Sequence, residues 1–189
     1  MKQTVLIISA LALVGCASTP YFISNPSDKN NAAIEKAIRN TAGKPTGELT
    51  ETDLEKVTKL SVAYRKLTDV SHLEGLTHLT NLVLHSNQLT DVSALEKLRK
   101  LKHLELQKNQ LTDVSPLASL KELEVLSLWG NKLTDVSPLA GLNRLKHLQL
   151  EHNQIADVSA LAGLRQLTHL NIGDNKVADI NALAGPNQL

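Results

Sequence analysis

Several histidines of this chain could supply metal-ligand or acid–base chemistry. Seven histidines occur, and His147 and His169 lie 22 residues apart, with Glu151 close to the first. Two imidazoles and a carboxylate can ligate zinc or copper, and imidazoles can make binding depend on pH. The alternative is an ordinary polar surface, where histidine is common. We favour the polar surface and predict neither a metal ion nor another cofactor.

Signatures of catalysis are missing from the sequence. It contains no GxSxG, HExxH or P-loop motif and no glycine-rich dinucleotide turn. Asp91, Asp113 and Asp135 recur at one fixed spacing, which is typical of a structural turn. We therefore expect a protein that is not an enzyme.

Trp129 is the only tryptophan in a chain with very few aromatic residues. Tryptophan is enriched at binding hot spots, so an outward-facing Trp129 indicates a site for a protein partner. The alternative is a surface side chain that lies over Gln107 and Glu151 and binds nothing.

Composition favours a regular core and excludes some partners. Leucine supplies 36 of 189 residues, whereas Phe, Trp and Tyr together supply four, so the core must be aliphatic and layered. The 20 Lys and Arg residues balance 19 Asp and Glu residues, which argues against a nucleic-acid partner. The single cysteine excludes an intrachain disulfide and a cysteine metal cluster.

The position of that cysteine indicates a processing signal. A short basic start precedes an apolar run over residues 4–14, which has the length of a signal-peptide core, and the run ends in Leu13-Val14-Gly15-Cys16. This segment resembles the bacterial lipobox. The resemblance implies a lipoprotein signal peptide at 1–15, acylation of Cys16 with palmitate-type chains, and a membrane anchor. An ordinary secretory peptide or a lone buried cysteine are the alternatives.

Residues 16–31 are rich in small and polar side chains and are predicted to be a flexible tether. Ala17 stands where an aspartate would resemble an inner-membrane retention signal. The resemblance therefore implies a cell-envelope location, in the outer membrane if the source is Gram-negative.

A repeat of 22 residues organises the rest of the chain. Asparagines recur without a gap, and so do leucine-type and aspartate positions. The asparagine positions are Asn87, Asn109, Asn131, Asn153 and Asn175. Such periodicity is typical of a solenoid in which each coil buries its aliphatic residues against its neighbours.

One repeat, from Leu101 to Leu120, resembles a bacterial, internalin-like leucine-rich repeat. The resemblance covers residues 57–185 as six repeats. It implies an α/β solenoid: an arc with a parallel β-sheet on its concave side and short helical or 3-10 turns on its convex side. In Ser115-Pro116 and Ser137-Pro138 we expect the serine hydroxyl to cap each turn.

The two ends of the array differ from its middle. Arg65 stands in the asparagine position of the first repeat. Residues 32–56 are predicted to form a small helical N-terminal cap, with an amphipathic helix from Asn31 and a capping box at Thr50-Asp53. Residues 186–189 are predicted to be a short tail, and the sequence shows no polar C-terminal cap. The last repeat would then expose Leu167, Leu170, Ile172 and Val177, which favours a homodimer. The alternative is that the last few residues fold over this end as a small lid.

Outward strand positions should form columns on the concave face, because residues 22 apart become neighbours. We predict that this face binds a protein partner. The candidate residues are Trp129, Tyr64, His85, His103, Glu105, Gln107, Val125, His147, Gln149, Glu151 and His169. The predicted function is a lipid-anchored, non-catalytic interaction module. Alternatives are a surface-exposed adhesin that contacts a host, as in internalin-like relatives, and a self-assembling envelope protein.

Overall fold

Six short strands form one parallel sheet along the length of the molecule. The computed structural model describes residues 29–183. The strands β1 (Lys59–Ser61), β2 (Asn81–Val83), β3 (His103–Glu105), β4 (Val125–Ser127), β5 (His147–Gln149) and β6 (His169–Asn171) pair in sequence order. Residues 22 apart are direct partners, such as Leu104 with Leu126. The predicted leucine-rich repeat solenoid is therefore confirmed.

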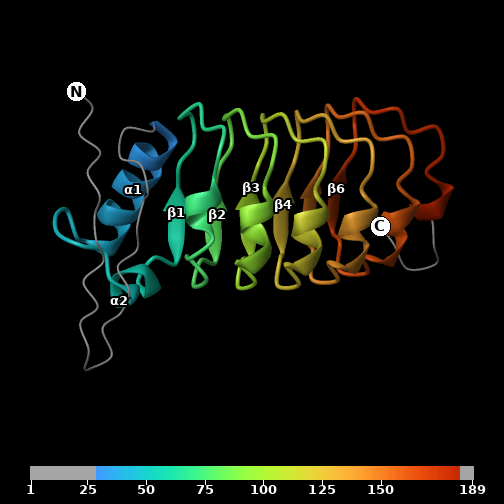
Figure 1. The fold of residues 1–189 in the computed structure, drawn as a ribbon. Helices are drawn as coiled ribbons and strands as arrows, with labels where there is room; N and C mark the ends of the chain where they lie inside the picture. The colour runs from blue at the N-terminus through green and yellow to red at the C-terminus, as the bar shows by residue number, and fades with distance from the viewer. Residues whose placement is uncertain (1–28, 184–189) are drawn as a thin grey trace.

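Short 3-10 segments form the wall opposite the sheet (Figure 1). They span Ser71–Leu73, Ser93–Lys97, Ser115–Ser119, Ser137–Gly141, Ser159–Gly163 and Asn181–Leu183. Each coil thus contains one strand and one 3-10 segment, and we number the coils 1 to 6 after their strands. In a stack of coils like this one, the side chains that point inward are mainly aliphatic.

Each inner coil buries one complete layer of aliphatic side chains. In coil 3 seven of them have 0 % exposure: Leu101, Leu104, Leu106, Leu111, Val114, Leu117 and Leu120. A fully buried leucine contributes about 2 kcal/mol of hydrophobic free energy relative to an exposed one. Because the layers are stacked, each coil covers the core of the next, and no coil could bury its leucines alone.

The recurring asparagines join neighbouring coils through their amides. The Asn131 side-chain oxygen accepts a hydrogen bond from the Leu111 N–H at 3.1 Å. Its amide nitrogen donates to the Leu106 and Leu128 carbonyls at 3.1 and 2.8 Å. Each of these amides thus pairs backbone groups of two neighbouring coils where the strand ends.

The serine-capping prediction was wrong. No serine side chain caps the 3-10 segments at Ser115 or Ser137, although Pro116 and Pro138 lie in their first turns as expected. Instead the Asp113 carboxylate accepts from the Ser115 N–H at 2.7 Å and from its hydroxyl at 2.8 Å. An aspartate two residues earlier offers two acceptor oxygens, so it satisfies both serine donors in one turn.

Two helices, α1 (Lys29–Ala42) and α2 (Glu51–Glu55), lie at the β1 end of the solenoid (Figure 1). α1 begins two residues before the expected Asn31 and buries Ile34 and Ile38 completely. The predicted capping box is confirmed: the Thr50 side chain accepts from the Asp53 N–H, and the Asp53 carboxylate accepts from the Thr50 N–H at 3.1 Å. These helices cover the first leucine layer.

Coil 6 is packed less completely than the inner coils. Leu167, Leu170, Ile172 and Val177 are half-buried, whereas their counterparts in coil 5 have 0 % exposure. The predictions for the signal peptide at 1–15, for Cys16 and for the tail at 186–189 fall outside the described residues. Within residues 29–183, no helix is both long and apolar enough to cross a bilayer.

Candidate functional site

The sheet surface opposite the 3-10 wall presents three columns of side chains. The strand register aligns His103, Val125, His147 and His169 in one column. The second column includes Val83, Glu105, Ser127, Gln149 and Asn171. The third, two residues beyond the last residue of each strand, contains His85, Gln107, Trp129 and Glu151. All the predicted concave-face residues except Tyr64, which lies just beyond the third column, belong to these columns.

Trp129 is half-buried in the third column and not freely exposed. The Lys108 ammonium nitrogen lies 4.7 Å from the centroid of a Trp129 ring. A cation over an aromatic face contributes about 0.5–1 kcal/mol at an exposed site. His152 lies on coil 5, with its ring centroid 6.3 Å from that of Trp129. Trp129 is therefore held by side chains from both neighbouring coils.

Two buried acceptors flank the tryptophan. The Gln107 Oε1 and Glu151 Oε2 atoms have no hydrogen-bond partner within the described part of the chain. The other polar atoms of these side chains are used: Gln107 Nε2 donates to Glu105 Oε2 at 3.0 Å, and Glu151 Oε1 accepts from Asn171 at 2.5 Å. A buried acceptor without a donor is costly, so this column can gain free energy from a partner's donors.

Sequence reasoning did not include Lys108 and His152 among the site residues. Both follow the third column by one residue, in the row of Tyr64, Ser86, Gly130 and Asp174. All six members of this row have a positive φ of 52–67°. This left-handed turn redirects the chain at the end of the strand and lifts the side chain beside the concave face. The sequence does contain a signal for these two residues, because the row to which they belong recurs every 22 residues.

Two other ring pairs lie on this surface. His147 and His169 stack with centroids 4.4 Å apart and an interplanar angle of 17°, so their predicted adjacency is confirmed. They line a cavity of about 510 Å³ together with Gln149, Thr168 and Asn171. Tyr64, which is 73 % exposed, meets His85 edge to face at 4.9 Å.

The concave face does not gather the ligands of a metal site. Over residues 29–183 no group of three His, Cys, Asp or Glu side chains is placed to hold an ion. Because the His147 and His169 rings are stacked and nearly parallel, their nitrogen atoms do not converge on one metal position. Glu151 hydrogen-bonds Asn171 and not either histidine of the pair.

The carboxylates of the turns and of the N-terminal cap form hydrogen bonds and ion pairs that stabilise local structure. The Ser115 N–H lowers the pKa of the Asp113 carboxyl, and the Ser159 N–H does the same for Asp157. The Lys44 ammonium, 2.6 Å away, together with Thr50, holds the pKa of Asp53 far below its usual range. None of these carboxylates belongs to the concave columns, which agrees with the interpretation of the repeated aspartates as turn residues.

Comparison with known proteins gives matches to repeat families. Two family models match: "Leucine Rich repeats (2 copies)" at residues 55–97 and 99–141, and "Leucine rich repeat" at residues 121–177. Among curated proteins, none matches significantly.

Solved structures give a more specific likeness. An internalin (inlF) of Listeria monocytogenes is 35 % identical with a TM-score of 0.78, over 81 % of this chain and 46 % of that one. Internalin C2 of the same organism is 28 % identical with a TM-score of 0.62, over 92 % and 96 %. The plant peptide hormone receptor RGFR1 in complex with RGF2 is 28 % identical with a TM-score of 0.53, over 57 % and 19 %. The chain spans less than half the length of the first of these.

Proposed function

This chain belongs to the leucine-rich repeat proteins and is internalin-like in its repeats, and from that membership we propose that it binds a protein partner, without catalysis, through its concave face. Leucine-rich repeat domains are protein-interaction modules, as the receptor complex above illustrates. The fold itself does not identify the binding surface, and the side chains of the concave face are what distinguish it.

The observation that carries this proposal is the environment of Trp129. The side chain lies near the middle of an open six-stranded sheet and is held by Lys108 and His152. A preorganised aromatic side chain loses little conformational entropy on binding, which is why such residues dominate interface energetics. The unpaired Gln107 and Glu151 acceptors beside it add sites for donors of the partner.

A crosslinking pull-down from intact cells tests the proposal. We expect Trp129→Ala to leave the thermal midpoint of unfolding nearly unchanged, because the side chain is outside the leucine core. Binding of the captured partner should weaken by more than about 1 kcal/mol. Affinity is then measured with purified components by calorimetry.

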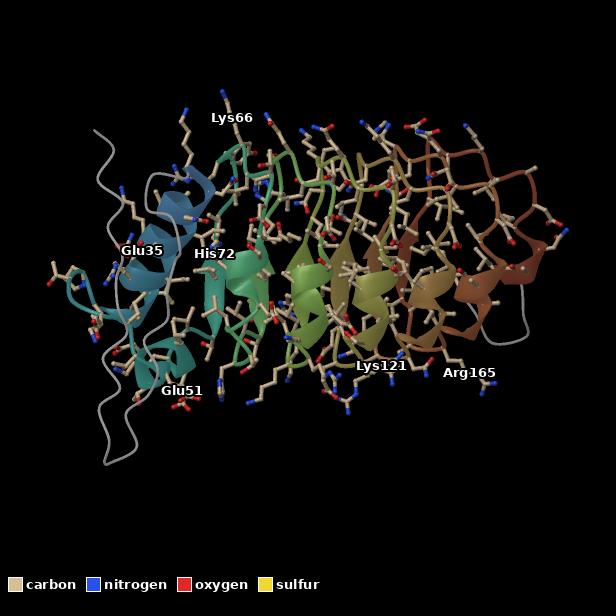
Figure 2. The ribbon with its side chains drawn as sticks, in the orientation of Figure 1. Glu35, Glu51, Lys66, His72, Lys121 and Arg165 are labelled. Carbon is tan, nitrogen blue, oxygen red and sulfur yellow. The ribbon has the colours of Figure 1, made fainter. Side chains whose placement is uncertain are left out.

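His72→Ala provides the matched control, because His72 lies on the 3-10 wall away from the sheet (Figure 2). It should bind the partner like the wild type. Equal affinity of Trp129→Ala and wild type for the partner would place the binding surface elsewhere.

For location, we propose a lipid-anchored protein of the bacterial cell envelope, attached through Cys16. Supporting this is the lipobox-like sequence before the only cysteine of the chain. Several acyl chains give stable membrane attachment, whereas one does not. Labelling of growing cells with palmitate tests the anchor: a purified protein that carries no label has no such modification. Membrane fractionation then distinguishes the outer membrane from the inner membrane.

Two alternatives have their own tests. A surface-exposed adhesin, as the likeness to internalins suggests, would be removed by protease treatment of whole cells, whereas a periplasmic component would survive. Self-assembly through coil 6 is favoured by the half-buried Leu167, Leu170 and Ile172. Sedimentation at micromolar concentration decides it, because a strict monomer excludes a homodimer.

A further inference from the structure

Positive charge gathers along one edge of the solenoid, although the chain as a whole is nearly neutral. The edge consists of the segments that lead from each 3-10 turn to the next strand, in coils 3 to 6. We use the name basic edge for its seven cationic residues: Arg99, Lys100, Lys102, Lys121, Arg144, Lys146 and Arg165. All seven are exposed. Lys121 and Arg165 mark this edge in Figure 2.

Only two carboxylates lie among these cations, and both are already used. Glu122 pairs with Arg144, and Glu124 pairs with Lys146 at 2.6 Å. The Lys146 ammonium lowers the pKa of Glu124, with smaller contributions from Lys102 and His103. Both glutamates are half-buried, whereas the cations are exposed. Across this edge of the described chain, the other five cations form no salt bridge.

Backbone hydrogen bonds hold the basic edge in register. The Glu124 N–H donates to the Lys102 carbonyl at 2.9 Å, and the Lys146 N–H donates to the Glu124 carbonyl at 2.8 Å. Equivalent residues of successive coils therefore stand side by side, about 4.8 Å apart. From Arg99 to Arg165 the row crosses three coil steps, or about 15 Å.

The opposite edge carries the opposite charge. It presents the turn aspartates Asp69, Asp91, Asp113, Asp135, Asp157 and Asp179. Their carboxylates accept hydrogen bonds from backbone N–H groups two residues on, as at Asp91 and Asp135. Only Lys66, Lys132 and Lys176 stand in the row beside them. Lys66 marks this edge in Figure 2. The balanced net charge therefore hides two edges of opposite sign.

We propose that the basic edge binds a linear polyanion, a non-nucleotide polymer that carries repeated phosphate or sulfate groups. A row of exposed cations without neighbouring carboxylate partners raises the local concentration of such a ligand and exchanges its counterions. Arg99 and Arg165 supply guanidinium groups, which can donate two hydrogen bonds to one phosphate or sulfate. This site is separate from the concave face.

The side chains around the edge favour this ligand over other anionic partners. Membrane-surface binding combines cations with inserted apolar side chains, but Leu98, Leu101, Leu120 and Leu123 between these cations are 0 % exposed. Residues 98–124 include no Phe, Tyr or Trp, so this stretch provides neither a stacking platform for bases nor an aromatic anchor for a protein. The affinity must come from charge, which requires a ligand of high linear charge density.

Calorimetric titration of the full chain with short linear polyphosphate and with a heparin fragment tests the proposal. The test variant is Arg99→Gln/Lys100→Gln/Lys121→Gln. We expect at least a tenfold loss of affinity for the polymer and a shallower dependence of affinity on salt, by about one in logarithmic slope for each contact removed. The control variant, Lys66→Gln/Lys132→Gln/Lys176→Gln, removes the same charge from the opposite edge and should lose less than twofold.

Each outcome decides the proposal. Binding of polyphosphate alone or of heparin alone supports it and identifies the anionic group. Equal losses in the two triple variants overturn it, because net charge alone would then explain binding. Tighter binding to anionic phospholipid vesicles than to the polymer, at equal phosphate concentration, also overturns it. Trp129→Ala should bind the polymer like the wild type, so failure here is distinguishable from failure of the concave-face proposal.

Discussion

Each asparagine of the repeat satisfies backbone groups of two coils with one side chain. Asn87 shows why the first coil can differ: it accepts from the Arg65 and Leu67 N–H groups of coil 1 and donates to the Val62 carbonyl. Within residues 29–183 two helices and no earlier coil precede coil 1, so its own asparagine position has no hydrogen bonds to an earlier coil to make. Arg65 can therefore occupy this position without the loss of a hydrogen bond to an earlier coil.

Asn131→Ala should destabilise the protein by about 3 kcal/mol, because the Leu111 N–H would be left buried without its acceptor. The Leu106 and Leu128 carbonyls would each lose one of two asparagine donors, since Asn109 and Asn153 also donate to them. Asn175 makes the equivalent bonds at the half-buried end of the array. We expect Asn175→Ala to cost about 1 kcal/mol, since water can replace part of its bonding. Urea denaturation of both variants measures the difference. Equal losses of unfolding free energy would show that burial does not determine how much these asparagine hydrogen bonds contribute.

At the scale of elements, the cap depends on one carboxylate. Asp53 accepts hydrogen bonds from Thr50 and forms ion pairs with Lys44 and Lys56 at 2.6 and 3.2 Å. These contacts connect α2 to the loop that follows α1. The short α2 could not persist as an isolated helix, because one turn of helix is too short to repay its nucleation cost.

Acid should therefore loosen the cap. The pKa of Asp53 is lowered on folding, so its contribution to stability is present above the unfolded value of about 3.9 and is lost as the pH falls toward the folded value. We expect Asp53→Asn to lower the thermal midpoint at pH 7 and to flatten its decline below about pH 4. Scanning calorimetry between neutral and acidic pH measures both effects.

Glu51→Gln is the matched control for this prediction, because Glu51 is an exposed carboxylate of the same helix. It should retain the pH dependence of the wild type. A wild-type pH profile in Asp53→Asn would show that the carboxylate does not stabilise the cap.

At the scale of the whole molecule, the protein is a stack in which each layer is covered by its neighbours. Coil 4 is covered on both sides, and Leu126 of β4 has 0 % exposure. Leu170 of β6 occupies the same position in coil 6 and is half-buried. The energetic importance of one repeat position should therefore depend on its place in the stack.

Leu126→Ala should cost about 3 kcal/mol or more, because it leaves a cavity between two complete layers. Leu170→Ala should cost about 1 kcal/mol, since its side chain is only partly removed from water. Chemical denaturation compares the unfolding free energies of the two variants, with the same dependence on denaturant concentration used for both. Similar losses would mean that the described end of the array is as well packed as its centre.

The repeat period by itself predicts most of this architecture. A spacing of 22 residues predicts parallel strands, the inward leucines and the adjacency of His147 with His169, because each is a consequence of periodicity. The capping box at Thr50 was equally visible, since it depends on residues three apart. Contacts between residues a few positions apart, or one repeat apart, can therefore be predicted from the sequence.

Only the tertiary structure decided how individual side chains share their contacts. Periodicity placed Trp129 outward, but its half-burial under Lys108 depends on the left-handed turn after β3. The two donors of Ser115 are satisfied by Asp113, because the turn places that carboxylate 2.7 Å from the backbone N–H and 2.8 Å from the hydroxyl. The separation of charge onto two edges also emerged there: net charge is a sum over the chain, whereas the field that a ligand meets depends on which side chains stand together.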